Sequence, residues 1–457
     1  MSGIAAARTD GWTRRIETLA IAARPYLPLL HIAMFVGFLA LIAGPVVLPA
    51  GPFADRLGHL ANWLIWTLWF PLVFLSVIVT GRSWCGVLCP MGAASEWVNG
   101  FGLKRAVPRW LRWEGTPIVS FLVITILGQT VGVRDYASAI LEVFGMTMLA
   151  ALVIGFLYGQ GTKKRAWCRH ACPIGLLLGV FSRLGAVDLR PKRPEPGGDA
   201  YDTRGLCPTM IDLRRKTESR HCVMCVRCVH PERPGALALA LRAPGSEVAD
   251  IQRHNPSLPE VWFMLLGTGV SLGGFLWLVL PQYQALRQSL GEWAIERGWY
   301  WIGEAGPSWL MSVHPEAREV FVWLDFVMIV GFMLAVMAAM TGVLAALQAL
   351  AAWIAGRLGA TGDFRARFTA FGYQIAPAAM ISLLLGLGSN LFALLPHAAA
   401  GPVKAGALVL AIGWSAYLGA RILSGMGLGG ARAVAALLPG VIGGIAVAAA
   451  WWPAVFA

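Results

Sequence analysis

Residues 82–93 read Arg-Ser-Trp-Cys-Gly-Val-Leu-Cys-Pro-Met-Gly-Ala, and residues 165–176 read Arg-Ala-Trp-Cys-Arg-His-Ala-Cys-Pro-Ile-Gly-Leu. The two stretches share the pattern Arg-x-Trp-Cys-x3-Cys-Pro-x-Gly, begin 83 residues apart and each follow a long apolar segment. This repeat indicates that one structural unit, made of apolar segments and a cysteine pair, occurs twice in the chain.

All eight cysteines belong to this repeat or follow it. After the second copy come one cysteine that precedes a proline and three cysteines in C-x2-C-x2-C spacing. A C-x2-C-x2-C run and a C-x3-C-P ending are the parts of the motif by which bacterial ferredoxins bind a [4Fe–4S] cluster. The sequence therefore predicts two [4Fe–4S] clusters, each with four thiolate ligands. The predicted ligands are Cys85, Cys89, Cys168, Cys172, Cys207, Cys222, Cys225 and Cys228.

The pairing of ligands with clusters has two interpretations. In the preferred one, the two repeats share the first cluster and Cys207 joins the later triplet. In two-cluster ferredoxins the Cys-Pro residue binds the cluster opposite to its own triplet, so Cys172 or Cys89 could instead serve the triplet while Cys207 joins the repeats. Structural zinc is an alternative metal because all-cysteine zinc sites also use C-x2-C steps, but three cysteines at successive x2 spacing suit a cube better.

Composition identifies the broad class. The chain has 457 residues, of which 57% are hydrophobic and 13% charged, whereas soluble domains carry about 25% charged residues. This indicates an integral membrane protein. The net charge of +13 fits the excess of Lys and Arg in cytoplasmic loops, and no stretch resembles a nucleic-acid-binding surface. Thiols that ligate metal fit the reducing side of a membrane better than a secreted disulfide framework.

Nine apolar runs are long enough, or nearly so, to span a bilayer, which takes about 20 residues. They cover residues 27–49, 59–80, 116–133, 138–159, 261–281, 319–354, 370–396, 403–424 and 432–456. The third is short and the sixth is overlong. Residues 160–260 hold 17 of the 37 Lys and Arg, which places this segment, the N-terminus and all the cysteines on the cytoplasmic side.

We therefore expect an all-α polytopic membrane protein with a small cytoplasmic ferredoxin-like module. Its predicted regions are a tail at 1–25, a duplicated two-span unit at 26–186, the module at 187–258 and a cysteine-free membrane region at 259–457. The segment Arg190-Pro-Lys-Arg-Pro-Glu-Pro-Gly-Gly198 is interpreted as a linker that opens the module.

The two cysteine motifs, the pair of spans before each and the three-cysteine run resemble the membrane polyferredoxin family over residues 60–235. The resemblance implies one-electron transfer between a cytoplasmic or quinol donor and a periplasmic redox protein or metal-uptake partner, in the bacterial inner membrane. It implies an electron carrier or oxidoreductase subunit more than a self-contained enzyme, with quinone as a further candidate cofactor. The chain departs from the family in having a single three-cysteine run and an added region after residue 259. The alternative function is an iron-transport or metalloenzyme-maturation component whose clusters are regulatory or supportive.

Other polar groups in the spans give weaker signals. No two histidines face one another at mid-membrane depth, so haem is not expected; His31 lies near the inner end of the first span. Glu142 and Asp325 are ionisable groups within spans and so are candidates for proton or cation handling. The alternative is that they pair with Arg134 and Arg318.

Overall fold

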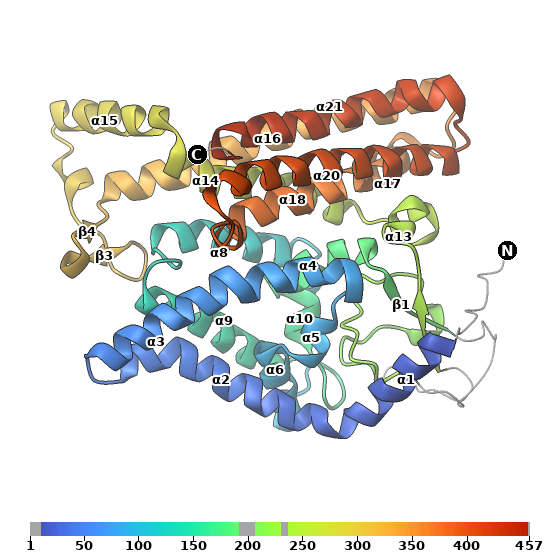
Figure 1. The fold of residues 1–457 in the computed structure, drawn as a ribbon, viewed down its shortest axis with the longest axis horizontal. Coiled ribbons are helices and arrows are strands. Elements are labelled where there is room, and N and C mark those ends of the chain that lie inside the picture. Colours follow the sequence, from blue (N-terminus) through green and yellow to red (C-terminus); the bar gives the residue numbers. More distant parts are fainter. Residues whose placement is uncertain (1–10, 192–205, 230–235, 456–457) are drawn as a thin grey trace. The chain divides into compact units, whose positions relative to one another are not determined.

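Helices dominate the structure, a computed structural model that describes residues 11–191, 206–229 and 236–455 (Figure 1). Within these residues, eight helical segments are long and apolar enough to cross a membrane. The expectation of an all-α polytopic membrane protein is therefore confirmed. The eight segments are Thr13–Val47, Pro52–Thr80, Ala137–Leu157, Leu258–Val279, Trp323–Arg357, Phe364–Leu387, His397–Gly425 and Gly430–Val455.

The third expected span, residues 116–133, is absent from these eight segments because helix α8 (Thr116–Thr130) has only 15 residues. At 1.5 Å per residue it is about 22 Å long, shorter than a hydrocarbon core of about 30 Å. Helix α9 (Ala137–Leu157) follows it and has the full length of a span.

Three of the spans are interrupted. The first consists of α1 (Gly11–Ala23), a 3-10 turn (Arg24–Tyr26) and α2 (Leu27–Val47). The second consists of α3 (Pro52–Asn62), a π-helical stretch (Trp63–Trp69) and α4 (Phe70–Thr80). The third consists of α17 (Phe364–Gly372), a 3-10 turn (Tyr373–Ile375) and α18 (Ala376–Leu387). Pro377 at the start of α18 lacks the N–H that a continuous helix would use.

The chain folds as two compact units. Unit 1 comprises residues 1–40, 73–120 and 146–255, and unit 2 comprises residues 41–72, 121–145 and 256–457. All eight cysteines belong to unit 1.

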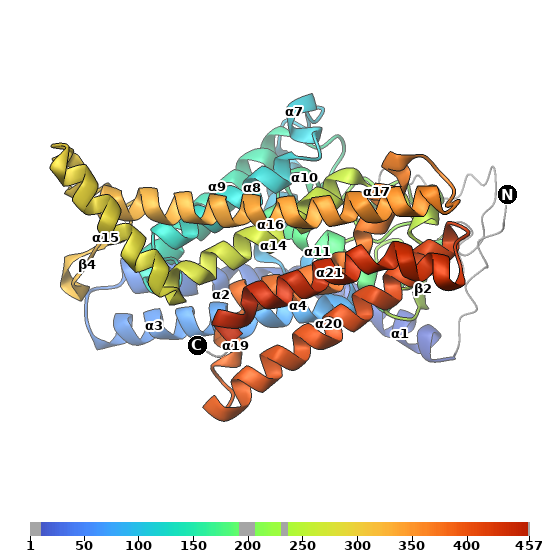
Figure 2. The ribbon, with the colours of Figure 1, turned by 90° about the horizontal axis from the view of Figure 1, so that it is seen from above.

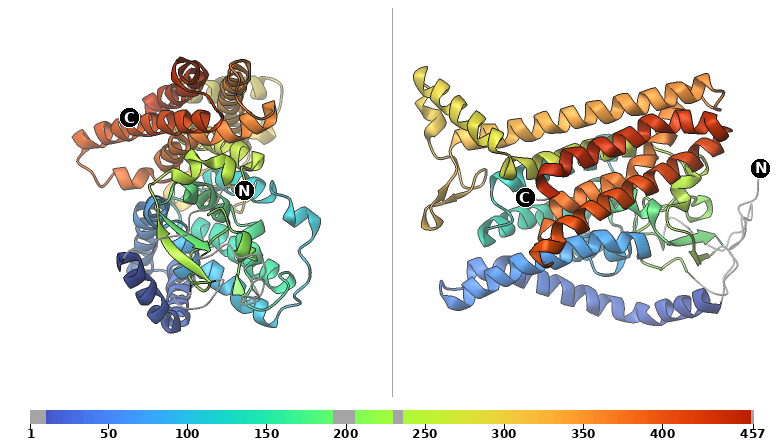
Figure 3. Two further views of the ribbon diagram at one scale, coloured as in Figure 1. Left: turned by 90° about the vertical axis from the view of Figure 1, so that its right-hand side faces the viewer. Right: turned by 45° about the horizontal axis from the view of Figure 1, so that its top comes forward.

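Unit 1 adds short helices and one two-stranded sheet to its membrane helices. The short helices are α5 (Ser83–Val87), α6 (Pro90–Phe101), α7 (Arg109–Arg112), α10 (Ala166–His170), α11 (Pro173–Phe181) and α13 (Ser246–Ala249). Strands β1 (Val187–Pro191) and β2 (Leu237–Leu241) form an antiparallel pair (Figure 3). In this pair Val187 lies opposite Leu241.

The linker interpretation is wrong for Arg190 and Pro191, which end strand β1. Proline fits a strand at its end, where it breaks no internal ladder bond. Residues 192–198 of the expected linker lie outside the described residues.

Unit 2 is a bundle in which α14 (Leu258–Val279) packs against α16 (Trp323–Arg357) and α18 (Figure 2). Gly269 and Gly273 of α14 lie against the backbone of α16, where an added Cβ would come 2.8 Å and 3.0 Å from the Cα atoms of Met337 and Met333. Small residues four apart allow this close approach of membrane helices. The remaining elements are α15 (Pro281–Glu296), β3 (Val313–His314), β4 (Glu319–Val320), α19 (Ser389–Phe392), α20 (His397–Gly425) and α21 (Gly430–Val455).

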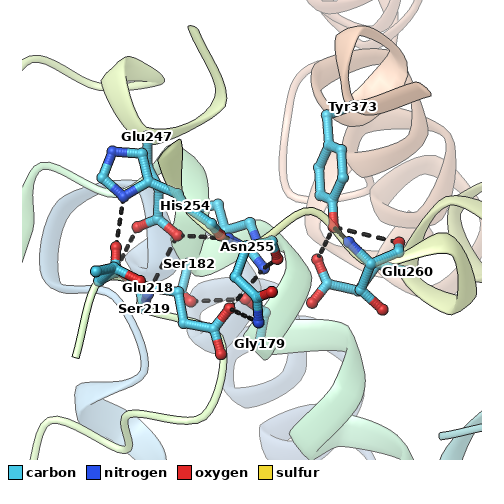
Figure 4. Close-up of polar contacts among 12 residues, drawn as sticks. Gly179, Ser182, Glu218, Ser219, Glu247, His254, Asn255, Glu260 and Tyr373 are labelled. Carbon is cyan, nitrogen blue, oxygen red and sulfur yellow. Dashed lines mark hydrogen bonds and ion pairs between the residues drawn. The ribbon is translucent and has the colours of Figure 1, made fainter. Parts of the chain in front are cut away.

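Within unit 2, Tyr373 of the interrupted span donates a hydrogen bond of 2.5 Å to the carboxylate of buried Glu260 near the start of α14 (Figure 4). The expected partners of the two membrane carboxylates are not the observed ones. Asp325 pairs with Arg287 at 2.5 Å instead of with Arg318. Arg134 donates to the carbonyl of Gly386 and to the hydroxyl of Ser389 instead of to Glu142.

Candidate iron–sulfur centre

The two copies of the cysteine motif have the same local structure. In each, a five-residue helix carries the first cysteine, and the second cysteine caps a new helix that begins at the proline. The Sγ atoms of Cys89 and Cys172 accept hydrogen bonds from the backbone N–H of Gly92 (3.4 Å) and of Gly175 (3.2 Å). Proline is favoured at the first helical position because its N–H would have no helical partner there. The Cys-Pro-x-Gly pattern thus encodes both a sulfur ligand and a helix N-terminus.

Folding brings the cysteines of the two motifs together as a first quartet: Cys85, Cys89, Cys168 and Cys172. A Cβ added at Gly92 in the first motif would lie 3.5 Å from Cys168 Sγ in the second. Burial raises the pKa of Cys172 well above its usual range, and the neighbouring thiols of the other three raise it further. The thiols of these four cysteines are therefore neighbours in the fold, although the two motifs begin 83 residues apart in the sequence.

The other four cysteines form a second quartet: Cys207, Cys222, Cys225 and Cys228. One cavity is lined by all four, together with Leu189, Leu213 and Lys216. Burial raises the pKa of Cys228 well above its usual range, with further contributions from the other three thiols. The hydrophobic core around this quartet includes Leu237 and Leu239 of β2, so the small sheet forms the wall behind it.

The two quartets are neighbours. A Cβ added at Gly86, next to Cys85, would lie 2.1 Å from the carbonyl oxygen of Val223 and 2.8 Å from the backbone nitrogen of Cys225. On the other copy, the backbone N–H of Arg165 donates to the carbonyl of Pro208 at 2.8 Å. The loop that carries Cys222, Cys225 and Cys228 (the triplet loop) thus packs on the first motif. The segment that carries Cys207 packs on the second motif.

Buried cations surround both quartets. Arg82 is 1% exposed and donates to Cys85 Sγ at 4.0 Å, and Arg165 is fully buried. Beside the second quartet, Lys216 pairs with Asp188 at 2.7 Å. A cluster with four thiolate ligands carries net negative charge, which must be compensated when it is buried.

Other donors also fit a cluster. Among the described residues, three buried side-chain nitrogens near the thiols lack a hydrogen-bond partner: Arg82 Nε, Arg165 Nη2 and Trp167 Nε1. Met224 and Val226, between the cysteines of the triplet, have left-handed backbone (φ 50° and 51°). Successive N–H groups in such conformations form concave anion-binding surfaces. For a β-branched valine this conformation is strained, so surrounding contacts must maintain it.

The thiols themselves disfavour the charged form without metal. Burial raises the pKa of Cys89 and of Cys222 to about 11 and that of Cys168 to about 12. In the described part of the chain, no three His, Cys, Asp or Glu side chains are grouped closely enough to hold a single metal ion. Thiolates on separate corners of a cube lie farther apart than those around one ion, and binding such a cube releases the thiol protons. Four thiols in each quartet, with buried cations and unpartnered buried N–H groups nearby, form a donor set that fits [4Fe–4S] clusters.

Several residues of the site were not expected from the sequence. Glu96 bridges Arg165 and Arg227 at 2.8 Å and 2.6 Å, and His31 lies 3.3 Å from the carbonyl of Gly86. Asn99 is fully buried and binds the carbonyls of Gly155, Tyr158 and Gly159 and the N–H of Lys164. The sequence could have indicated Glu96 and Asn99, because both are polar residues within the mostly apolar helix α6 that follows the first cysteine motif.

A second polar network holds the chain that leads to the triplet. Glu247 accepts a hydrogen bond of 2.6 Å from the hydroxyl of Ser219 (Figure 4). It also pairs with Arg183 at 2.8 Å and with Arg242 at 2.5 Å. All of these side chains are buried or nearly so. The network positions residue 219, three residues before the first cysteine of the triplet.

Comparison with known proteins agrees with this site. Residues 62–108 and 142–193 match a 4Fe-4S binding domain, and these ranges contain the first quartet. The chain is similar to the ferredoxin-type protein NapH of Escherichia coli, with 25% identity over 38% of this chain and 66% of that protein. It is also similar to protein NirI of Paracoccus denitrificans (28% identity, 36% of this chain, 26% of that protein) and to the putative electron transport protein YccM of Escherichia coli (27%, 32% and 48%).

The chain thus spans from about a quarter to two thirds of the length of these relatives. No solved structure matches it. A duplicated pair of membrane segments, each followed by cluster-binding cysteines, defines a ferredoxin-type iron–sulfur membrane protein. Over residues 62–193 the chain is therefore similar to ferredoxin-type membrane proteins that carry a 4Fe-4S binding domain.

Proposed function

We propose that this protein carries single electrons through two [4Fe–4S] clusters on the cytoplasmic side of the inner membrane. The first cluster is held by Cys85, Cys89, Cys168 and Cys172, and the second by Cys207, Cys222, Cys225 and Cys228. The observation that carries the proposal is the division of the eight thiols, six of them buried and two partly buried, into two neighbouring quartets. A [4Fe–4S] cluster exchanges one electron at a time, and neighbouring clusters can pass that electron between them.

The clusters connect a cytoplasmic or quinol donor with a periplasmic redox system. Unit 2, which contains no cysteine, provides further membrane helices that a membrane partner or a quinone can contact. The names of the relatives support electron transport as the activity, because NapH is a ferredoxin-type protein and YccM a putative electron transport protein.

The first test of the proposal is metal content. The anaerobically purified protein should contain about eight irons and about eight acid-labile sulfides and give two EPR signals on reduction. Zinc without sulfide would contradict the cluster assignment, and about four irons would leave only one cluster.

Pairs of substitutions distinguish this ligand pairing from the swapped one. Cys207→Ala with Cys225→Ala removes two ligands of one cluster, so about four irons and one EPR signal should remain. Cys207→Ala with Cys85→Ala removes a ligand from each cluster, so both signals should disappear. The swapped pairing, in which Cys207 belongs with the repeats, gives the reverse pattern.

A further inference from the structure

The repeated arginines, Arg82 and Arg165, occupy equivalent places in the two motifs and reach across to the opposite copy. A Cβ added at Gly175 would lie 3.1 Å from Arg82 Nη2, and one added at Gly92 would lie 3.1 Å from Arg165 Nη1. Both side chains are buried, at 1% and 0% exposed. The exchange ties each motif to the other and places both guanidiniums beside the first quartet.

The two arginines differ in whether a carboxylate pairs with them. Arg165 pairs with Glu96 at 2.8 Å. The equivalent of Glu96 in the second copy, 83 residues later, is Gly179, which packs against the carbonyl of Arg220. Arg82 donates to that carbonyl at 2.6 Å, and within the described residues no carboxylate pairs with it. The positive charge of Arg82 can therefore act on the thiolates of the first quartet, with which its side chain is in contact through Cys85.

The two arginines also differ in their contacts with the second quartet. Arg82 donates to Cys85 Sγ. Arg165 holds the carbonyl of Cys85 at 2.6 Å, and its backbone N–H binds the loop of Cys207. Through Glu96 it is linked to Arg227, which lies between Cys225 and Cys228 of the second quartet.

The positions of the side chains agree with this difference. A Cβ added at Gly92 would lie 3.1 Å from Arg165 Nη1 and 3.5 Å from Cys168 Sγ of the first quartet, and Glu96 links Arg165 to Arg227 of the second. Arg165 thus lies beside the first quartet and is linked to the second.

We propose that the duplicated arginine has diverged into two redox-tuning residues: Arg82 raises the potential of the first cluster alone, whereas Arg165 raises and links the potentials of both. This inference rests on the two-cluster function proposed above. Reduction adds one negative charge to a cluster, so a buried cation nearby stabilises the reduced form and raises its midpoint potential. A charge between two clusters acts on both.

The test is a redox titration of the purified, cluster-loaded protein followed by EPR, after iron and sulfide analysis of each variant. Arg82→Gln should lower the midpoint potential of the first cluster and leave that of the second unchanged, and Arg82→Lys should restore most of the shift. Arg165→Gln should lower both potentials. Arg215→Gln removes the same charge from a side chain that is 90% exposed and should change neither.

If an arginine variant loses iron, a variant that is expected to shift the midpoint potentials in the opposite direction still tests the inference. Glu96→Gln removes the carboxylate that offsets Arg165 and should raise both potentials. A shift of both potentials in Arg82→Gln, or of only one in Arg165→Gln or Glu96→Gln, would overturn the inference. Wild-type protein with fewer than two clusters would contradict the proposed function instead, which the iron analysis reveals separately.

Discussion

At the scale of single residues, glycines decide how closely the two quartets approach. Gly86 is the contact point, because its Cα faces the backbone of Val223 and Cys225 without room for a side chain. Backbone atoms cannot move aside as the end of a flexible side chain can. A methyl group at this position therefore separates the triplet loop from the first motif.

We predict that Gly86→Ala destabilises the protein by about 1–3 kcal/mol, the usual cost of overpacking, and lowers the iron content of the second cluster. Thermal unfolding and iron analysis measure the two effects. Gly100→Ala is the matched control, since a Cβ there meets nothing within 4 Å and alanine favours the helix. Equal stability and iron content in the two variants would argue against the tight contact.

At the scale of elements, strand β1 is held by charge as well as by its pairing with β2. Asp188 of β1 contacts Lys216 at 2.7 Å and Arg242 at 3.6 Å, and all three side chains are at most 5% exposed. Burial raises the pKa of Asp188, but the positive charges of Lys216 and Arg242 lower it by more than burial raises it. The pKa of Asp188 therefore lies below its ordinary value. The ion pairs therefore contribute to the stability of the module around the second quartet.

We predict that Asp188→Asn lowers the unfolding free energy by about 3–5 kcal/mol at neutral pH, because it leaves the buried ammonium of Lys216 without its carboxylate. Since the folded-state pKa of Asp188 is lowered, its contribution is complete above the unfolded value of about 3.9 and is lost as the pH falls below it. Thermal unfolding followed by circular dichroism at a series of pH values should show the gap between wild type and variant narrowing in acid.

The control for that experiment is Asp212→Asn, which weakens a pair of exposed side chains 4.0 Å apart. Such pairs are worth about 0–1 kcal/mol. A gap between wild type and Asp188→Asn that stays constant down to acid pH would show that Asp188 acts through packing instead of charge.

At the scale of the whole molecule, the first quartet restricts the membrane topology. Cys85 and Cys89 precede α8 and α9, and Cys168 and Cys172 follow them. The two pairs lie together only if the chain crosses the membrane an even number of times between them. The short helix α8 must therefore cross with α9, or both must stay on one side, and α9 has the length of a full span.

We predict that α8 crosses, so that the turn at residues 131–136 is periplasmic. Alkaline phosphatase, which is active only outside the cytoplasm, should be active when fused after Gly132 and inactive when fused after Lys104 or Gly161. The basic residues around the latter two sites favour the cytoplasmic side. Low phosphatase activity at residue 132 would exclude the crossing.

Local patterns predicted most of the membrane helices well. The expected spans at 27–49, 138–159 and 432–456 correspond to helices at Leu27–Val47, Ala137–Leu157 and Gly430–Val455. The interruptions at Trp63–Trp69 and Tyr373–Ile375 were not expected, because apolar residues there continue without a change of composition. The β1–β2 pair was missed because its proline and charged residues read as a linker.

The sequence alone determined the membrane class, the repeat and the eight candidate ligands, because hydropathy, cysteine spacing and Cys-Pro helix starts are properties of short segments. The arrangement of the thiols in two neighbouring quartets depends on contacts between distant segments, such as Gly86 with Cys225 and Arg82 with Arg220. The same is true of the different surroundings of Arg82 and Arg165. The two motifs share one pattern, but Glu96 in the first copy corresponds to Gly179 in the second, and folding places Glu96 beside Arg165 and the Arg220 carbonyl beside Arg82.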